Sequence, residues 1–258
     1  MKSVEVKDVS IKYLIGDFRH IGFKDYIIKK LKKTYRVEDF YANKNISFSL
    51  EKGDMLGIIG VNGAGKSTLL KVISGVMDPS EGEVITHGNI ASFLELSAGF
   101  DIDLTVKENA YLRGAMLGYD EQFMNSIYKD IIEFSELEKY EDRPIKELSS
   151  GMRARLAFSI GSFVRPDIII LDEVLAVGDG AFRQKSYTKM KEILSSGATG
   201  IIVSHSLDQI KSLCNKILWL DKGEVVSFTD DIEKCLNLYN KFLKEKYKGY
   251  NISNGWKR

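Results

Sequence analysis

A glycine-rich stretch that begins at Gly60 carries the clearest chemical signal in the sequence. It fits the pattern G-x-x-x-x-G-K-[ST], follows the apolar run Met55–Ile59 and precedes the helical pattern Leu69–Ser74. Its glycines let backbone N–H groups face a phosphate, and the helix adds the positive end of its dipole. The lysine is expected to neutralise the β- and γ-phosphates of a nucleotide, and the first hydroxyl residue to bind magnesium. The expected nucleotide contacts are Gly60, Asn62, Gly63, Ala64, Gly65, Lys66, Ser67 and Thr68, with Ser67 as the metal ligand.

A second apolar run, Ile168–Leu171, ends in two acidic residues, Asp172 and Glu173. A buried strand of this kind delivers both carboxylates to its polar end. Asp172 is expected to contact magnesium directly or through water. Glu173 is expected to orient and deprotonate the attacking water. Together with the glycine-rich stretch, these residues predict an ATPase site with ATP and Mg²⁺ as ligands.

The elements that must position these residues predict an α/β fold. Short apolar runs that end in polar residues indicate a buried parallel sheet with a site at its strand ends; they are Met55–Ile59, Ile168–Leu171 and Ile201–Val203. Before them, alternating residues around Val4–Ile11 and Ile46–Glu51 predict an antiparallel β layer. Between them lies a mostly helical block, with helical patterns over residues 106–117, 121–135 and 153–164.

Composition excludes several classes of protein. The 258 residues carry 37 basic and 36 acidic side chains, so a formal charge of +1 gives no chain-wide reason to expect a nucleic-acid partner. Cys214 and Cys235 lack the spacing of a zinc site or a disulfide framework, which favours a reducing, cytoplasmic setting. We expect neither a signal peptide nor a membrane span, because no apolar run approaches the roughly 18 to 20 residues that a span requires.

The segment Leu148–Arg153, with sequence LSSGMR, stands ahead of Asp172 and resembles the signature of ABC ATPases, normally written LSGGQ. A Ser-x-Gly turn at the start of a helix is a second anion cradle. In ABC ATPases it closes on the γ-phosphate bound by the opposite subunit. The resemblance therefore implies a homodimer with two composite sites that include Ser149 and Gly151. It also implies a P-loop ABC ATPase fold, with a RecA-like core, an antiparallel β layer and an inserted helical subdomain.

Other positions match the family in order. Asp179 stands at the D-loop, and His205 follows an apolar strand as the switch histidine, which implies a contact with the γ-phosphate. Tyr13 matches the aromatic residue that stacks on adenine, and Phe40 and Tyr41 compete with it for this role.

Within the family, the stretches Leu94–Asn109 and Ser149–Phe158 resemble ATPases that export lipid-linked polysaccharides such as teichoic acids, O-antigens and capsular glycans. Glu95 stands where most ABC proteins have a glutamine, and it either touches a magnesium-bound water or only couples motion. The resemblance implies a transmembrane permease partner, a lipid-linked glycan as substrate and a position on the cytoplasmic face of the membrane. The alternatives are a soluble ABC ATPase acting on ribosomes or DNA, and an importer ATPase, which Glu95 and the Lys-rich insertion after the first strand disfavour.

These observations predict an ATPase domain over residues 1–228, with the helical subdomain at about 98–164 and a C-terminal helix and tail over 229–258. An insertion at about 15–40 is expected to hold a basic amphipathic helix, with Phe23, Tyr26, Ile27 and Leu31 on one face and lysines on the other. Such a helix suits a membrane surface, and a solvated helix on its own domain is the alternative. The C-terminal helix is expected to pack on its own domain or to form a dimer contact.

Overall fold

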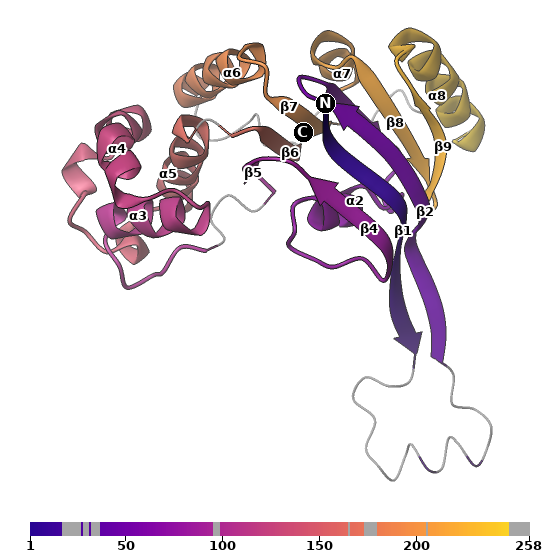
Figure 1. Cartoon of the computed structure of the whole chain (residues 1–258), viewed down its shortest axis with the longest axis horizontal. Coiled ribbons are helices and arrows are strands. Elements are labelled where there is room, and N and C mark those ends of the chain that lie inside the picture. The colour runs from indigo at the N-terminus through magenta and orange to yellow at the C-terminus, as the bar shows by residue number, and fades with distance from the viewer. Residues whose placement is uncertain are drawn as a thin grey trace.

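Two β-sheets and helix α2 share one buried core at the centre of the molecule (Figure 1). The computed structural model describes residues 1–16, 27, 31, 37–94, 99–164, 166–172, 180–204 and 206–247. The strands are β1 Lys2–Gly16, β2 Val37–Glu51, β3 Met55–Ile59, β4 Glu81–Thr86, β5 Ile90–Ser92, β6 Ile168–Asp172, β7 Thr199–Val203, β8 Lys216–Asp221 and β9 Glu224–Thr229. The α-helices are α2 Lys66–Ile73, α3 Val106–Met116, α4 Glu121–Ser135, α5 Ser150–Phe163, α6 Gly180–Ser195, α7 Leu207–Leu213 and α8 Ile232–Lys246. Two short 3₁₀ turns, Glu138–Tyr140 and Ile145–Glu147, lie between α4 and α5.

The larger sheet has six strands in the order β5-β6-β7-β3-β8-β9. Its pairings are parallel except for that of β8 with β9. Strands β3 and β7 are buried along their whole length, because helices or the second sheet cover both faces. The predicted buried parallel sheet is therefore confirmed.

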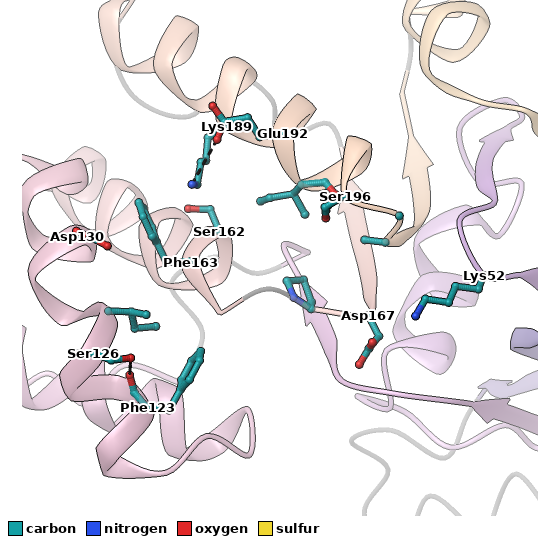
Figure 2. Close-up of a pocket in the computed structure, with 15 residues that line it drawn as sticks. Lys52, Phe123, Ser126, Asp130, Ser162, Phe163, Asp167, Lys189, Glu192 and Ser196 are labelled. Carbon is teal, nitrogen blue, oxygen red and sulfur yellow. Dashed lines mark hydrogen bonds and ion pairs between the residues drawn. The ribbon is translucent and has the colours of Figure 1, made fainter.

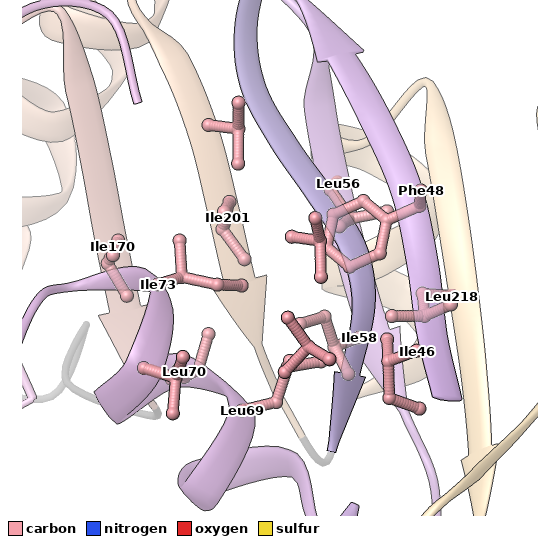
Figure 3. Close-up of a cluster of buried hydrophobic side chains, with 14 of the residues drawn as sticks. Ile46, Phe48, Leu56, Ile58, Leu69, Leu70, Ile73, Ile170, Ile201 and Leu218 are labelled. Carbon is pink, nitrogen blue, oxygen red and sulfur yellow. The ribbon is translucent and has the colours of Figure 1, made fainter. Parts of the chain in front are cut away.

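Alternate residues of the central strands serve two different cores. Leu56 and Ile58 of β3 face the core shared with the antiparallel sheet, whereas Met55 and Ile59 face helices α6–α8. The antiparallel sheet, in the order β2-β1-β4, closes over the first core together with α2. Figure 3 shows this core, which includes Ile46, Phe48, Leu56, Ile58, Leu69, Leu70, Ile73, Ile170, Ile201 and Leu218.

Helix α8 packs on its own domain. Its residues Cys235, Leu236 and Tyr239 are buried, and the Tyr239 ring centroid lies 5.4 Å from that of Trp219 on β8. Phe242 meets the same Trp219 ring at 5.2 Å. Of the two roles expected for the C-terminal helix, the structure supports packing. Among the described residues, no helix has the length and apolar character needed to cross a membrane.

Helices α3, α4 and α5 form a cluster with a core of its own, beside the end of the sheet that carries β5 (Figure 1). Glu136, just after α4, links this cluster to α6. Its carboxylate lies 2.9 Å from Arg155 of α5 and 3.5 Å from Lys185 of α6. Lys185 also donates to the Phe134 carbonyl, at 3.0 Å. The predicted start of the third helix, at Arg153, is three residues late, because Ser149 caps the helix by accepting a hydrogen bond from the Met152 N–H.

Strands β1 and β2 pair beyond the sheet as a two-stranded ribbon, which extends away from the rest of the molecule (Figure 1). The pairing runs to Gly16 and Val37, so Tyr13 lies within a strand and does not end it. Most of the predicted basic helix lies outside the described residues. Its Ile27 and Leu31 are described, and both are helical and exposed.

Candidate nucleotide-binding site

The glycine-rich loop joins the end of β3 to the start of α2, and its backbone needs glycine at two points. Gly60 has φ 156°, and a Cβ there would lie 2.4 Å from the Leu220 carbonyl oxygen. Gly65 has φ 97°, and a Cβ there would lie 2.4 Å from the Ala42 carbonyl oxygen. Both positions therefore exclude larger residues by conformation and by space. Because Gly65 caps α2 without a side chain, the first N–H groups of the helix are left for an anion.

Lys66 is buried beneath this loop, although its side chain ends in a charge. Its ammonium donates to the carbonyl oxygens of Gly60, at 2.7 Å, and Val61, at 3.1 Å. Asn62, Gly63 and Ser67 are exposed on the loop and the first turn of α2. The loop thus combines a buried cation, exposed backbone turns and a hydroxyl, which fits the phosphates of a nucleotide.

The carboxyl ends of three neighbouring strands meet beside the loop. Val203 of β7 pairs with Ile58 of β3 on one side and with Asp172 of β6 on the other. Ile58, Val203 and Asp172 thus lie side by side across the three strands. The loop starts at Gly60, two residues after Ile58, and is therefore close to Asp172. Ser67 and the Asp172 carboxylate are oxygen ligands of the kind that magnesium prefers. Four predicted site residues lie outside the described residues: Glu95, Glu173, Asp179 and His205.

Ser149 and Gly151 lie at the start of α5, in the helical cluster, and both are exposed. The Ser149 hydroxyl accepts from the Met152 N–H at 3.2 Å, and the first turn of α5 has no acidic residue. This helix start is open to an anion. It belongs to a different part of the fold from α2 (Figure 1), as a site shared between two copies requires.

Tyr13 and Phe40 lie opposite each other on the ribbon, and both are substantially exposed. The Tyr13 hydroxyl lies 3.6 Å from the Met77 sulfur. Tyr41 is opposite Lys12, one residue before Ala42, which touches Gly65. All three aromatic candidates thus lie on the part of the ribbon next to the loop.

A cleft of about 850 Å³ lies elsewhere (Figure 2). It separates α4 and α5 from α6, and it includes Lys52, Asp167 and Ala198, which precede β3, β6 and β7. It therefore opens at the amino ends of the parallel strands, away from the loop. Inside it, Lys189 lies 4.2 Å from the Phe163 ring centroid and 3.4 Å from Glu192.

Sequence reasoning missed Asn43, whose side chain packs against Gly65. The contact joins residues that are distant in the chain, and its only sequence signal is an amide within a strand.

Other residues that could act as nucleophiles or metal ligands are less suited to these roles. Burial raises the pKa of the Cys214 thiol to about 12, and no cluster of three metal-ligating side chains occurs in the described part of the chain.

Known proteins are similar to this chain in both sequence and fold. The ABC transporter family profile matches residues 43–176. A teichoic acids export ATP-binding protein of Staphylococcus epidermidis is 38% identical over 242 residues, which cover 94% of this chain and 89% of that protein. The chain belongs to the ABC transporter family. As in other ABC ATPases, its role is to bind and hydrolyse ATP for a transporter.

Further relatives agree with this assignment. An O-antigen export system ATP-binding protein of Klebsiella pneumoniae is 40% identical over 88% of this chain and 93% of its own length. A teichoic acids export ATP-binding protein of Bacillus anthracis is 38% identical over 94% of this chain, which spans only 43% of that protein. Among solved structures, an ATP-binding subunit of an ABC transporter matches with a TM-score of 0.71 at 23% identity, covering 95% of this chain and 98% of its own. This confirms the predicted ABC ATPase fold.

Proposed function

We propose that this ABC ATPase drives export of a lipid-linked cell-surface polysaccharide across the cytoplasmic membrane. The observation that carries the proposal is its identity of 38–40% with teichoic acid and O-antigen export ATP-binding proteins over 88–94% of the chain. A soluble ATPase that acts on ribosomes or DNA is a poorer match, because the formal charge of +1 provides no chain-wide attraction to nucleic acid. An importer ATPase lacks comparable support.

The ATPase chemistry follows from the site. Lys66 and the N–H groups at the start of α2 hold the β- and γ-phosphates, and Tyr13 stacks on adenine. Ser67 and Asp172 would hold Mg²⁺, which would neutralise charge on the phosphate oxygens. Glu173 accepts a proton as water attacks the γ-phosphorus, and the bond to the bridging oxygen breaks to leave ADP and phosphate. His205 contacts the γ-phosphate, while Glu95 either touches a magnesium-bound water or only couples motion.

A second copy of the chain completes each site. Ser149 and Gly151 lie on an exposed helix start in a different part of the fold from α2, which supports a contact with the γ-phosphate held by another copy. The two copies thereby hold two ATP molecules between them.

A groove of about 460 Å³ between α2, β5 and α3 supports a docking site for the transmembrane permease. Val76 and Met116 line it and are 65% and 63% exposed, so they offer an apolar contact to a partner. Lys71 and Arg113 add cationic groups. Leu94, at its edge, directly precedes Glu95, so a partner in this groove lies next to the segment that connects the site with the helical cluster. The chain would thus act on the cytoplasmic face of the membrane.

The test is export by the assembled transporter. The chain and its permease are reconstituted in liposomes with a lipid-linked glycan, and ATP turnover and outward movement of the glycan are measured. The wild type should export only with hydrolysable ATP and Mg²⁺. Glu173→Gln should bind ATP yet stop both activities, because an amide hydrogen-bonds water but does not accept its proton.

Two outcomes would count against the proposal. Turnover by Glu173→Gln above about a tenth of the wild-type rate would remove Glu173 from the role of base. Normal ATP turnover by the wild type without movement of any lipid-linked glycan would instead retain the ATPase and reject the substrate class.

A further inference from the structure

Asn43 of β2 is a fully buried amide without a hydrogen-bond partner. Its exposed fraction is 0%, and neither Nδ2 nor Oδ1 has a partner among the described residues. Such a group costs about 1–3 kcal/mol when left unpaired. Asn109, the other buried asparagine of the described core, uses both ends of its amide, so burial alone does not explain the state of Asn43.

The amide of Asn43 is directed at the phosphate-binding loop. A Cβ built on Gly65 would lie 2.5 Å from its Nδ2 and 3.1 Å from its Cγ, so the amide lies directly against the Gly65 backbone. A bulge in β2 produces this approach. Ile11 is opposite Asn43 and Lys12 is opposite Tyr41, which leaves Ala42 as the extra residue. Bulges of this type redirect side chains beside functional sites.

Several neighbouring carbonyl groups of the loop are already paired. The Ala64 carbonyl accepts from the Gly223 N–H at 3.1 Å, and the Gly65 carbonyl accepts from the Leu69 N–H at 3.0 Å. Lys66 occupies the Gly60 and Val61 carbonyls. The Asn43 Nδ2 group therefore gains one of these carbonyls only if the loop rearranges, and Lys66 is the group expected to turn toward a phosphate.

We propose that Asn43 is a positioning residue for the phosphate-binding loop. Its amide hydrogen-bonds the loop backbone around Gly65 when the loop holds the phosphates of a nucleotide. Because the bond is absent in the present loop arrangement, the buried amide destabilises this arrangement and favours the phosphate-bound one. The inference rests on the proposed role of the loop in ATP binding, and it adds a residue outside the glycine-rich motif.

The test compares Asn43→Leu with Ser186→Ala. Ser186 is also fully buried with an unpaired hydroxyl, but it lies on α6, away from the loop. Thermal unfolding is measured without nucleotide, and the dissociation constant for MgATP is measured by calorimetry. Both variants should raise the melting temperature, because each removes an unpaired buried polar group. Asn43→Leu alone should weaken MgATP binding about tenfold, equivalent to about 1.4 kcal/mol.

Asn43→Ala provides a second measurement of affinity in case leucine does not fit. Folded variants that bind MgATP within about twofold of the wild type would overturn the inference. A lower melting temperature for Asn43→Leu without nucleotide would also overturn it, since the amide would then stabilise the present loop. If the wild type itself failed to bind MgATP, the proposed ATPase function would fail instead.

Discussion

Two buried asparagine side chains, Asn109 and Asn43, differ in how they contact the loops beside them. The Asn109 side chain accepts from the Asp101 N–H at 2.8 Å and donates to the carbonyls of Asp101, Leu104 and Thr105 at 2.9–3.0 Å. It thereby fixes the turn before α3, which follows the segment that contains Glu95. Asn43 makes no such bonds. The same side chain is fully hydrogen-bonded beside one loop and unpaired beside another.

Asn109→Leu should therefore destabilise the protein, in contrast to Asn43→Leu. The substitution leaves the Asp101 N–H and carbonyl without their partner, whereas the Leu104 and Thr105 carbonyls keep the N–H groups of Ile145 and Asn109. We therefore expect the free energy of unfolding to fall by about 3 kcal/mol. Urea unfolding followed by circular dichroism measures this change. Asn109→Asp keeps the acceptor and loses the donors, so it should give an intermediate loss. A loss below about 1 kcal/mol for Asn109→Leu would show that the turn does not depend on this amide.

Helices and strands were predictable from the sequence where their pattern of residues lies within one segment of the chain. The apolar runs of β3, β6 and β7 lie where the sequence places them, because strands that are buried on both faces must be apolar throughout. The approach of Asn43 to Gly65 was not predictable, because it depends on a bulge and on strand pairing. The start of α5 was predicted late, since the apolar pattern begins inside the helix whereas its cap comes before it.

Helix α8 provides a prediction at the scale of the element. Deletion of residues 230–258 should expose Trp219, which is only 7% exposed beneath Tyr239 and Phe242. We expect a red shift of its fluorescence and a loss of about 3 kcal/mol or more in the free energy of unfolding. Deletion of residues 248–258 is the matched control, because it removes Trp256 but leaves α8. If the chain without residues 230–258 kept the wild-type melting temperature but lost self-association, α8 would be a dimer contact.

At the scale of the whole molecule, the two halves of the proposed site lie on separate bodies. The loop and α2 belong to the central core, whereas the start of α5 belongs to the helical cluster (Figure 1). Glu136 joins the cluster to α6 through Arg155 and Lys185. In the chain, α6 directly follows the segment that contains Glu173 and Asp179.

A mixture of two inactive variants tests whether each site is shared between copies. Lys66→Ala should lose ATP binding, because the phosphates lose the buried cation of the loop. Ser149→Arg should bind ATP but fail to close, since a bulky cation fills the exposed helix start. A heterodimer of the two pairs the intact loop of the Ser149→Arg copy with the intact α5 of the Lys66→Ala copy. Its other site contains both defects.

The mixture should thus hydrolyse ATP faster than either variant alone. With random pairing, half of the dimers are heterodimers with one working site, so about a quarter of the wild-type rate is expected if the sites act independently. Steady-state ATP turnover of the assembled transporter measures this rate. The control is a mixture of the Lys66→Ala variant with a double variant that carries both Lys66→Ala and Ser149→Arg, because none of its dimers has an intact loop. If the first mixture were no faster than this control, each site would be confined to one chain. In that case, the start of α5 would act on the nucleotide bound by its own chain.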